Sequence, residues 1–127
     1  MKALEDIFRE MDFEFFGFGQ HTINLNNAVQ MVDQKDKAIF LDIRTDEERK
    51  YLSFNFAYPI PVHELPDRIH ELPKDKLIII FCSSVVRSGI VYPYLLAQGF
   101  EKVKILVAKI EELAGAFKPG KIYSRLK

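Results

Sequence analysis

The chain alternates between short apolar runs and stretches in which apolar residues recur every three or four positions. Short apolar runs bounded by turn residues are typical of buried strands, and the recurring pattern is typical of helices that bury one face. The strand pattern occurs over residues 22–24, 38–42, 56–58, 77–81 and 102–107. The helical pattern occurs over residues 2–11, 24–32, 46–51, 62–70, 88–98 and 109–117. Strands that alternate with helices predict an α/β fold, with a parallel central sheet of about five strands and helices on both faces.

Residues 1–21 precede this pattern, and residues 22–127 are expected to form the main part of a single globular domain. After the first helix, Asp12–Gly19 is predicted to be irregular and holds four phenylalanines: Phe13, Phe15, Phe16 and Phe18. One interpretation is a strap whose rings pack on the domain. The other is a homodimer surface or a lip over the functional site, because exposed aromatic clusters mark contact surfaces. The sequence leaves a monomer and a homodimer open.

Composition narrows the class of protein. The 127 residues suit one domain with one core, and the formal net charge of zero lacks the basic footprint of a nucleic-acid-binding protein. A single cysteine excludes an internal disulfide and offers no cluster of metal ligands, so we expect no metal site. Residues 1–12 are too charged for a secretory signal, and no apolar stretch could span a membrane. We therefore expect a cytoplasmic protein that binds neither nucleic acid nor membranes.

The candidate chemistry lies in Leu77–Gly89, where an apolar strand runs into Cys82, the only cysteine. A short loop follows, then Arg87 and Ser88, which we expect to cap the next helix. Such a loop gathers backbone N–H groups and the positive end of the helix dipole, which favours anions. A lone cysteine after a strand is most often a small buried hydrophobe. Here, however, the loop, the arginine and the helix favour a reactive thiolate at the strand end where ligands bind in parallel sheets.

These residues resemble the single-domain rhodanese-like sulfurtransferases over roughly Asn24–Leu113. The family's aspartate-apolar-arginine motif is matched by Asp42-Ile43-Arg44, and its active loop is matched by Cys82, Arg87 and Ser88. Further matches, in order along the chain, are Glu47, Glu48, Tyr51, Ala57, Ile60-Pro61, Leu72–Lys76, Gly99-Phe100, Val103 and Leu106. No single match is specific, but their ungapped order over this length is.

The resemblance implies a sulfurtransferase that carries a sulfur atom as a persulfide on Cys82. It implies thiosulfate or a protein persulfide as the donor, and a thiol or cyanide as the acceptor. The substrate-binding loop would then comprise Ser83, Ser84, Val85, Val86, Arg87 and Ser88. Asp42 and Arg44 lie on the same side of an extended chain, and we interpret both as structural. We expect Arg44 to pair with a carboxylate and Asp42 to accept backbone N–H bonds.

Two other functions stay open at this point. The apolar Val85 and Val86 suit a module that carries or senses sulfur, or that only binds a protein. A phosphatase or arsenate reductase is less favoured, because those relatives have a loop one residue longer and Arg87 here falls five positions after Cys82. Val85 also stands where the family has glycine. If the loop follows the family's path, Val85 would take a strained positive φ; otherwise the loop runs differently.

Overall fold

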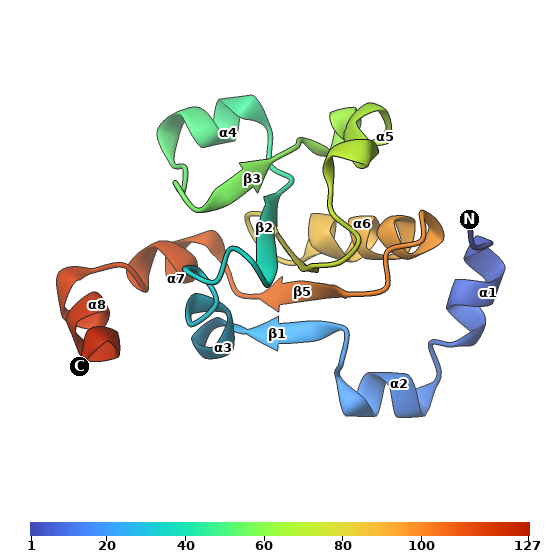
Figure 1. The fold of residues 1–127 in the computed structure, drawn as a ribbon, viewed down its shortest axis with the longest axis horizontal. Coiled ribbons are helices and arrows are strands. Elements are labelled where there is room, and N and C mark those ends of the chain that lie inside the picture. The colour runs from blue at the N-terminus through green and yellow to red at the C-terminus, as the bar shows by residue number, and fades with distance from the viewer.

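The computed structural model describes residues 1–127 as a single five-stranded sheet with helices on both faces (Figure 1). The strands are β1 (Thr22–Asn24), β2 (Ala38–Asp42), β3 (Ala57–Pro59), β4 (Leu77–Phe81) and β5 (Val103–Val107). The helices are α1 (Leu4–Arg9), α2 (Phe13–Phe18), α3 (Leu25–Val29), α4 (Asp46–Tyr51), α5 (Leu65–Arg68), α6 (Val86–Ala97), α7 (Ile110–Gly115) and α8 (Pro119–Leu126). Two short 3₁₀ turns, Val62–Glu64 and Ile69–Glu71, flank α5.

The strand order is β1-β5-β4-β2-β3, and every neighbouring pair is parallel. This confirms the predicted α/β architecture. The middle strand is β4, so Cys82 follows directly on the most central strand of the sheet. The N-terminal helices α1 and α2 and the C-terminal helix α8 lie at opposite ends of the molecule (Figure 1). No helix combines the length and the apolar character that a transmembrane segment requires.

Two cores lie on opposite faces of the sheet, because successive strand residues point to opposite sides. In β4, Ile78 and Ile80 face the core that includes Val91 and Leu95 of α6, and Cys82 belongs to the same core. Ile79 and Phe81 face the other core, which also includes Ala28 of α3 and Leu113 of α7. The end of β4 therefore directs Cys82 toward α6 and Phe81 toward α3 and α7.

Most predicted elements are confirmed with small shifts at their ends. The strand over residues 38–42 and the helix over residues 46–51 have the predicted bounds. Asn24 caps α3, since its Oδ1 accepts the N–H of Asn27 at 2.8 Å. The single helix predicted over residues 62–70 is instead divided into α5 and its flanking turns. Pro66 has no N–H to donate to the carbonyl of Val62, which prevents a regular helical bond there.

The aromatic segment differs from its prediction. Asp12–Gly19 is not irregular, because Asp12 accepts the N–H of Phe15 at 2.9 Å and begins α2. Gly19 ends this helix in the left-handed conformation, at φ 67°. Only the Phe15 ring packs against the core; the other three rings, Phe13, Phe16 and Phe18, are 92%, 58% and 71% exposed. The strap interpretation is therefore wrong for these three rings, and a homodimer through them stays a prediction.

Candidate functional site

Cys82 lies at the C-terminal end of β4 and faces the first turn of α6. Its side chain is almost fully buried, and its thiol donates to the carbonyl of Ser84 at 3.1 Å. The hydroxyl of Ser88 donates to Cys82 Sγ at 3.3 Å. Ser88 was expected to cap the helix; instead α6 begins at Val86, and Ser88 is buried in its first turn. The Ser88 hydroxyl therefore binds the sulfur instead of capping the helix, and it can donate to either a thiol or a thiolate.

The loop that follows Cys82 keeps its backbone donors free. None of the N–H groups of residues 83–88 donates to a protein acceptor, and the first such bond is from Gly89 to the carbonyl of Val85, at 2.9 Å. The first N–H groups of a helix have no partner within the helix, which accounts for part of this set. The loop itself is held in place from α7, where the N–H of Ile110 donates to the carbonyl of Ser83 at 2.9 Å. A set of unpaired backbone donors therefore follows Cys82 along the loop and into the first turn of α6.

Val85 adopts an ordinary backbone conformation, with φ −118° and ψ −5°. No residue other than glycine has a positive φ anywhere in the chain. Of the two alternatives for Val85, the strained one is therefore wrong, and the loop runs differently, in a way that suits a β-branched residue. The side chains of Val85 and Val86 point outward and are 40% and 69% exposed, so neither encloses the sulfur.

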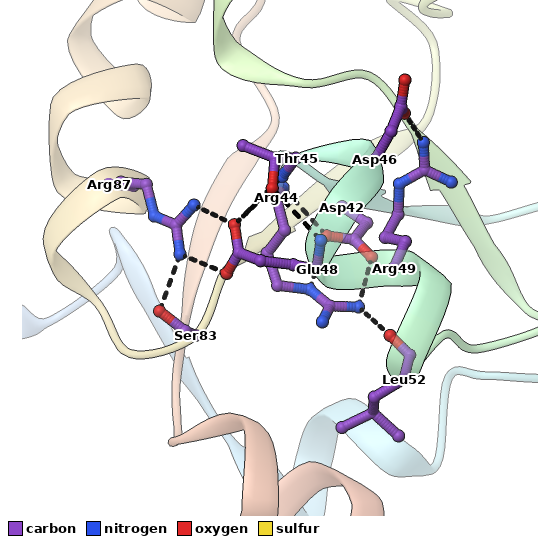
Figure 2. Close-up of polar contacts among 9 residues, drawn as sticks. All are labelled: Asp42, Arg44, Thr45, Asp46, Glu48, Arg49, Leu52, Ser83 and Arg87. Carbon is purple, nitrogen blue, oxygen red and sulfur yellow. Dashed lines mark hydrogen bonds and ion pairs between the residues drawn. The ribbon is translucent and has the colours of Figure 1, made fainter.

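Arg87 is bound to a carboxylate from a distant segment (Figure 2). Its two terminal nitrogens donate to the two oxygens of Glu48 at 2.7 and 2.8 Å, and one of them also donates to Ser83 Oγ at 2.7 Å. These bonds lower the pKa of Glu48 to about 2, with help from Thr45 and against an opposing effect of burial. The same hydrogen bonds raise the pKa of Arg87. The positive charge of Arg87 is thus already compensated in this structure.

Glu48 was matched only as one of an acidic pair, and its contact with Arg87 was missed. The local signal is the Thr45-x-x-Glu48 spacing of a capping box, which the structure contains. The N–H of Glu48 donates to Thr45 Oγ1 at 3.2 Å, and Glu48 Oε1 accepts the N–H of Thr45 at 3.1 Å. This motif predicts the start of α4. It does not predict the ion pair, whose partners are separated by 39 positions.

Asp42 and Arg44 form a buried ion pair, as expected for structural residues. Asp42 Oδ1 accepts both the backbone N–H and the Nε–H of Arg44 at 3.0 Å, and Oδ2 accepts from Nη2 at 2.8 Å. The Arg44 guanidinium also lies over the rings of Phe54 and Phe81, 5.9 and 6.0 Å from their centroids. Nη2 donates further to the carbonyl of Leu52 at 2.9 Å. Arg44 therefore fixes the C-terminal end of the helix that carries Glu48.

The polar side chains of the predicted site are thus partly assembled. The structure brings the Ser88 hydroxyl and the backbone carbonyl of Ser84 to the sulfur, and it joins Arg87 to both Ser83 and Glu48. No group of three or more His, Cys, Asp and Glu side chains lies close enough together to hold a metal ion. The arrangement is a buried thiol, one hydroxyl donor and a row of unpaired N–H groups, which suits covalent chemistry at sulfur.

Comparison with known proteins gives consistent matches. The family model described as the rhodanese-like domain matches residues 25–115, from α3 to the end of α7. The sulfurtransferase of Allochromatium vinosum is 32% identical over 81 residues, which cover 64% of this chain and 76% of that protein. The putative sulfurtransferase YtwF of Bacillus subtilis is 30% identical over 76 residues, which cover 60% and 74%.

A solved structure supports the same match. The crystal structure of a rhodanese-like domain protein from Staphylococcus aureus has a TM-score of 0.66 and 25% identity to this chain. The superposition covers 72% of this chain and 89% of that one. The region matched by the family model contains β2, α4, β4 and the whole loop around Cys82.

Proposed function

The chain belongs to the family of rhodanese-like domains, and from this we propose that it is a sulfurtransferase that carries sulfur as a persulfide on Cys82. The observation that carries the proposal is the position of Cys82 at the C-terminal end of the central strand, directly before a loop whose N–H groups, over residues 83–88, have no protein acceptor. We include thiosulfate and persulfides among the donors, and thiols and cyanide among the acceptors. No metal or organic cofactor takes part in this chemistry.

In the first half-reaction, the thiolate of Cys82 attacks the outer sulfur of the donor. With thiosulfate, a new S–S bond forms to Cys82, the donor's own S–S bond breaks, and sulfite leaves with two negative charges. One negative charge stays on the terminal sulfur of the Cys82 persulfide, so charge is conserved. Because Cys82 is 1% exposed, the donor has to displace part of the loop, including the contact of the thiol with Ser84, to reach it.

In the second half-reaction, an acceptor attacks the terminal sulfur. Cyanide takes this sulfur to become thiocyanate, or a thiolate takes it to become a persulfide. The electron pair of the broken S–S bond goes to Cys82, which is released as a thiolate. Free loop N–H groups and the Ser88 hydroxyl support this cycle, because fixed dipoles stabilise negative sulfur without reorganising. The two half-reactions form a ping-pong cycle with a covalent intermediate.

Intact-mass measurement tests this proposal. Mixing the protein with thiosulfate should add the mass of one sulfur atom, and cyanide should then remove it. The matched control is Cys82→Ser, which keeps the size of the side chain and removes the only thiol. We expect no sulfur gain in this variant. Sulfur transfer at the parent rate in Cys82→Ser, or no sulfur gain in the parent protein from any donor, would contradict the proposal.

A second candidate function is a sulfur carrier or sensor that delivers its persulfide to a protein. The observation that favours it is the apolar rim of the loop, where Val86 and Ile90 are 69% and 65% exposed. Such a carrier would be loaded by the same chemistry but would turn over slowly with cyanide and low-molecular-weight thiols. A stable persulfide that small acceptors discharge slowly supports the carrier, whereas rapid discharge supports the enzyme.

A further inference from the structure

Every arginine around the candidate site is paired with a carboxylate (Figure 2). Arg44 binds Asp42 and Arg87 binds Glu48, each at 3.0 Å or less, and Arg49 binds Asp46. Three arginines and three carboxylates leave a formal charge of zero. At the start of α7, which contacts the loop through Ser83, Lys109 and Glu112 add one charge of each sign.

The Glu48–Arg87 pair is the one that bears on the donor. It uses both oxygens of the carboxylate and both terminal nitrogens of the guanidinium, the fork geometry that a bound oxyanion would otherwise occupy. The two side chains are 33% and 32% exposed, so the pair lies at the mouth of the site rather than in the core. An anionic donor therefore finds the fork of Arg87 already filled.

Formation of the Cys82 thiolate makes the site negative overall. Thiosulfate carries two negative charges, so it meets repulsion from the thiolate that Arg87 no longer offsets. A protonated alkyl persulfide carries no charge. Its reaction balances as RS–SH with the Cys82 thiolate to give RS⁻ and Cys82–S–SH: the new S–S bond forms, the old one breaks, and the proton stays on the transferred sulfur. This donor does not require a positively charged subsite.

The exposed side chains of the loop and of the first turns of α6 are apolar. They are those of Val85, Val86 and Ile90. These side chains offer contacts to the carbon skeleton of a thiol and none to a sulfonate group.

We propose that Glu48 is a specificity-determining positioning residue, which holds and neutralises Arg87 and so makes Cys82 take sulfur from alkyl persulfides in preference to the doubly charged thiosulfate. This inference rests on the proposed function, since it concerns the donor of the same half-reaction. Glu48 acts through Arg87 and has no part in forming or breaking the S–S bonds.

The test compares two donors with the full-length protein and with Glu48→Gln. The donors are thiosulfate and the persulfide of N-acetylcysteine methyl ester, and the rate constant for loading Cys82 is followed by intact mass. We expect the parent protein to prefer the persulfide. Glu48→Gln frees the charge of Arg87, so its thiosulfate constant should rise about tenfold, while its persulfide constant stays within about twofold.

The matched control is Glu47→Gln, which removes an exposed carboxylate from the neighbouring position of the same helix. We expect this variant to keep the parent's ratio of the two rate constants. An unchanged ratio in Glu48→Gln, or an equal change in Glu47→Gln, would overturn the role of Glu48 while leaving sulfur transfer intact. If neither donor loads the parent protein with sulfur, the proposed function is overturned, and this inference with it.

The salt dependence of loading in the parent protein tests the role of Glu48 without a variant, and it can be measured even if Glu48→Gln does not fold. Raising the ionic strength from roughly 0.01 M to roughly 0.15 M screens charges at the mouth. We expect the thiosulfate constant of the parent to stay level or rise, because repulsion from the thiolate is reduced. In a folded Glu48→Gln protein, where the freed charge of Arg87 offsets the thiolate, the thiosulfate constant should depend less on salt than it does in the parent. A clear fall in the parent would show that Arg87 attracts the donor and would overturn the inference.

Discussion

Replacing Asp42 with asparagine leaves the guanidinium of Arg44 buried without a counter-charge. The two side chains are 1% and 3% exposed, so water does not screen or solvate the remaining charge. Asparagine keeps one oxygen but presents an amide N–H₂ toward a group that has only donors. Removing one partner of a buried ion pair costs about 3–5 kcal/mol. We expect Asp42→Asn to lower the free energy of unfolding by an amount in this range.

The companion variants separate the pair from its surroundings. Arg44→Met leaves Asp42 as the uncompensated charge and also removes the donor to the carbonyl of Leu52, an unsatisfied group worth about 1–3 kcal/mol. The double variant has no buried charge and loses only that carbonyl partner and the ring contacts. Its cost should therefore be smaller than the sum of the single costs, with a coupling free energy of about 2–3 kcal/mol.

Urea unfolding followed by far-ultraviolet circular dichroism measures these differences, because the chain has no tryptophan to serve as a fluorescent probe. The control is Asp67→Asn, the same chemical change at an exposed position, which should stay within about 0.5 kcal/mol of the parent. Single costs below about 1 kcal/mol that simply add in the double variant would refute the reasoning, since a buried pair cannot be so weakly coupled.

Three further predictions follow from the loop and from Glu48. Val85→Gly should lower the free energy of unfolding by about 1 kcal/mol, because φ −118° is ordinary for valine and glycine adds freedom to the unfolded chain; a more stable variant would reveal strain. Arg87→Ala should slow the loading of Cys82 by thiosulfate about tenfold, because Glu48 is then an unpaired negative charge at the mouth of the site. Arg87→Lys should recover only part of this rate, because lysine lacks the fork of the guanidinium. Equal rate constants in the parent and both variants would contradict this prediction. The pKa of Glu48 is about 2 in the folded protein, against 4.5 for an ordinary glutamate, so the stability that its charge contributes is present above pH 4.5 and is lost as the pH falls toward 2. Between these two pH values the melting temperature should fall less steeply for Glu48→Gln than for the parent protein. The same slope in both proteins would count against the Glu48–Arg87 pairing.

Much of the fold could be predicted because its determinants are local. The strand over residues 38–42 is a continuous apolar run, and the helix over residues 46–51 is a short charged segment that the structure shows capped by Thr45, so both have local determinants. The segment Asp12–Gly19 was misjudged because its phenylalanines and glycines have poor helix propensity. The Asp12 cap and the left-handed Gly19 outweigh that propensity over a helix of six residues.

The misjudged parts of the site share a different cause. Ser88 has the chemistry of a helix cap, and only the approach of Cys82 from the strand before it explains why its hydroxyl binds sulfur instead. Val85 looked strained only by analogy with a glycine elsewhere in the family. The backbone path of a loop is set by what holds its ends, and here the Ile110 N–H and the Arg87 side chain hold Ser83 from two sides.

The two ion pairs work in sequence, although the first lies at the end of β2 and the second joins α4 to α6. Arg44, held by Asp42, donates to the carbonyl of Leu52 and so fixes the C-terminal end of α4. Thr45 caps the N-terminal end of the same helix. A helix held at both ends presents Glu48 in one place. Arg87 then has a rigid partner rather than a mobile one, and through Ser83 it constrains the loop that surrounds Cys82. A buried pair that never touches the sulfur therefore sets the charge and the shape of the site, because each contact restricts the element that carries the next.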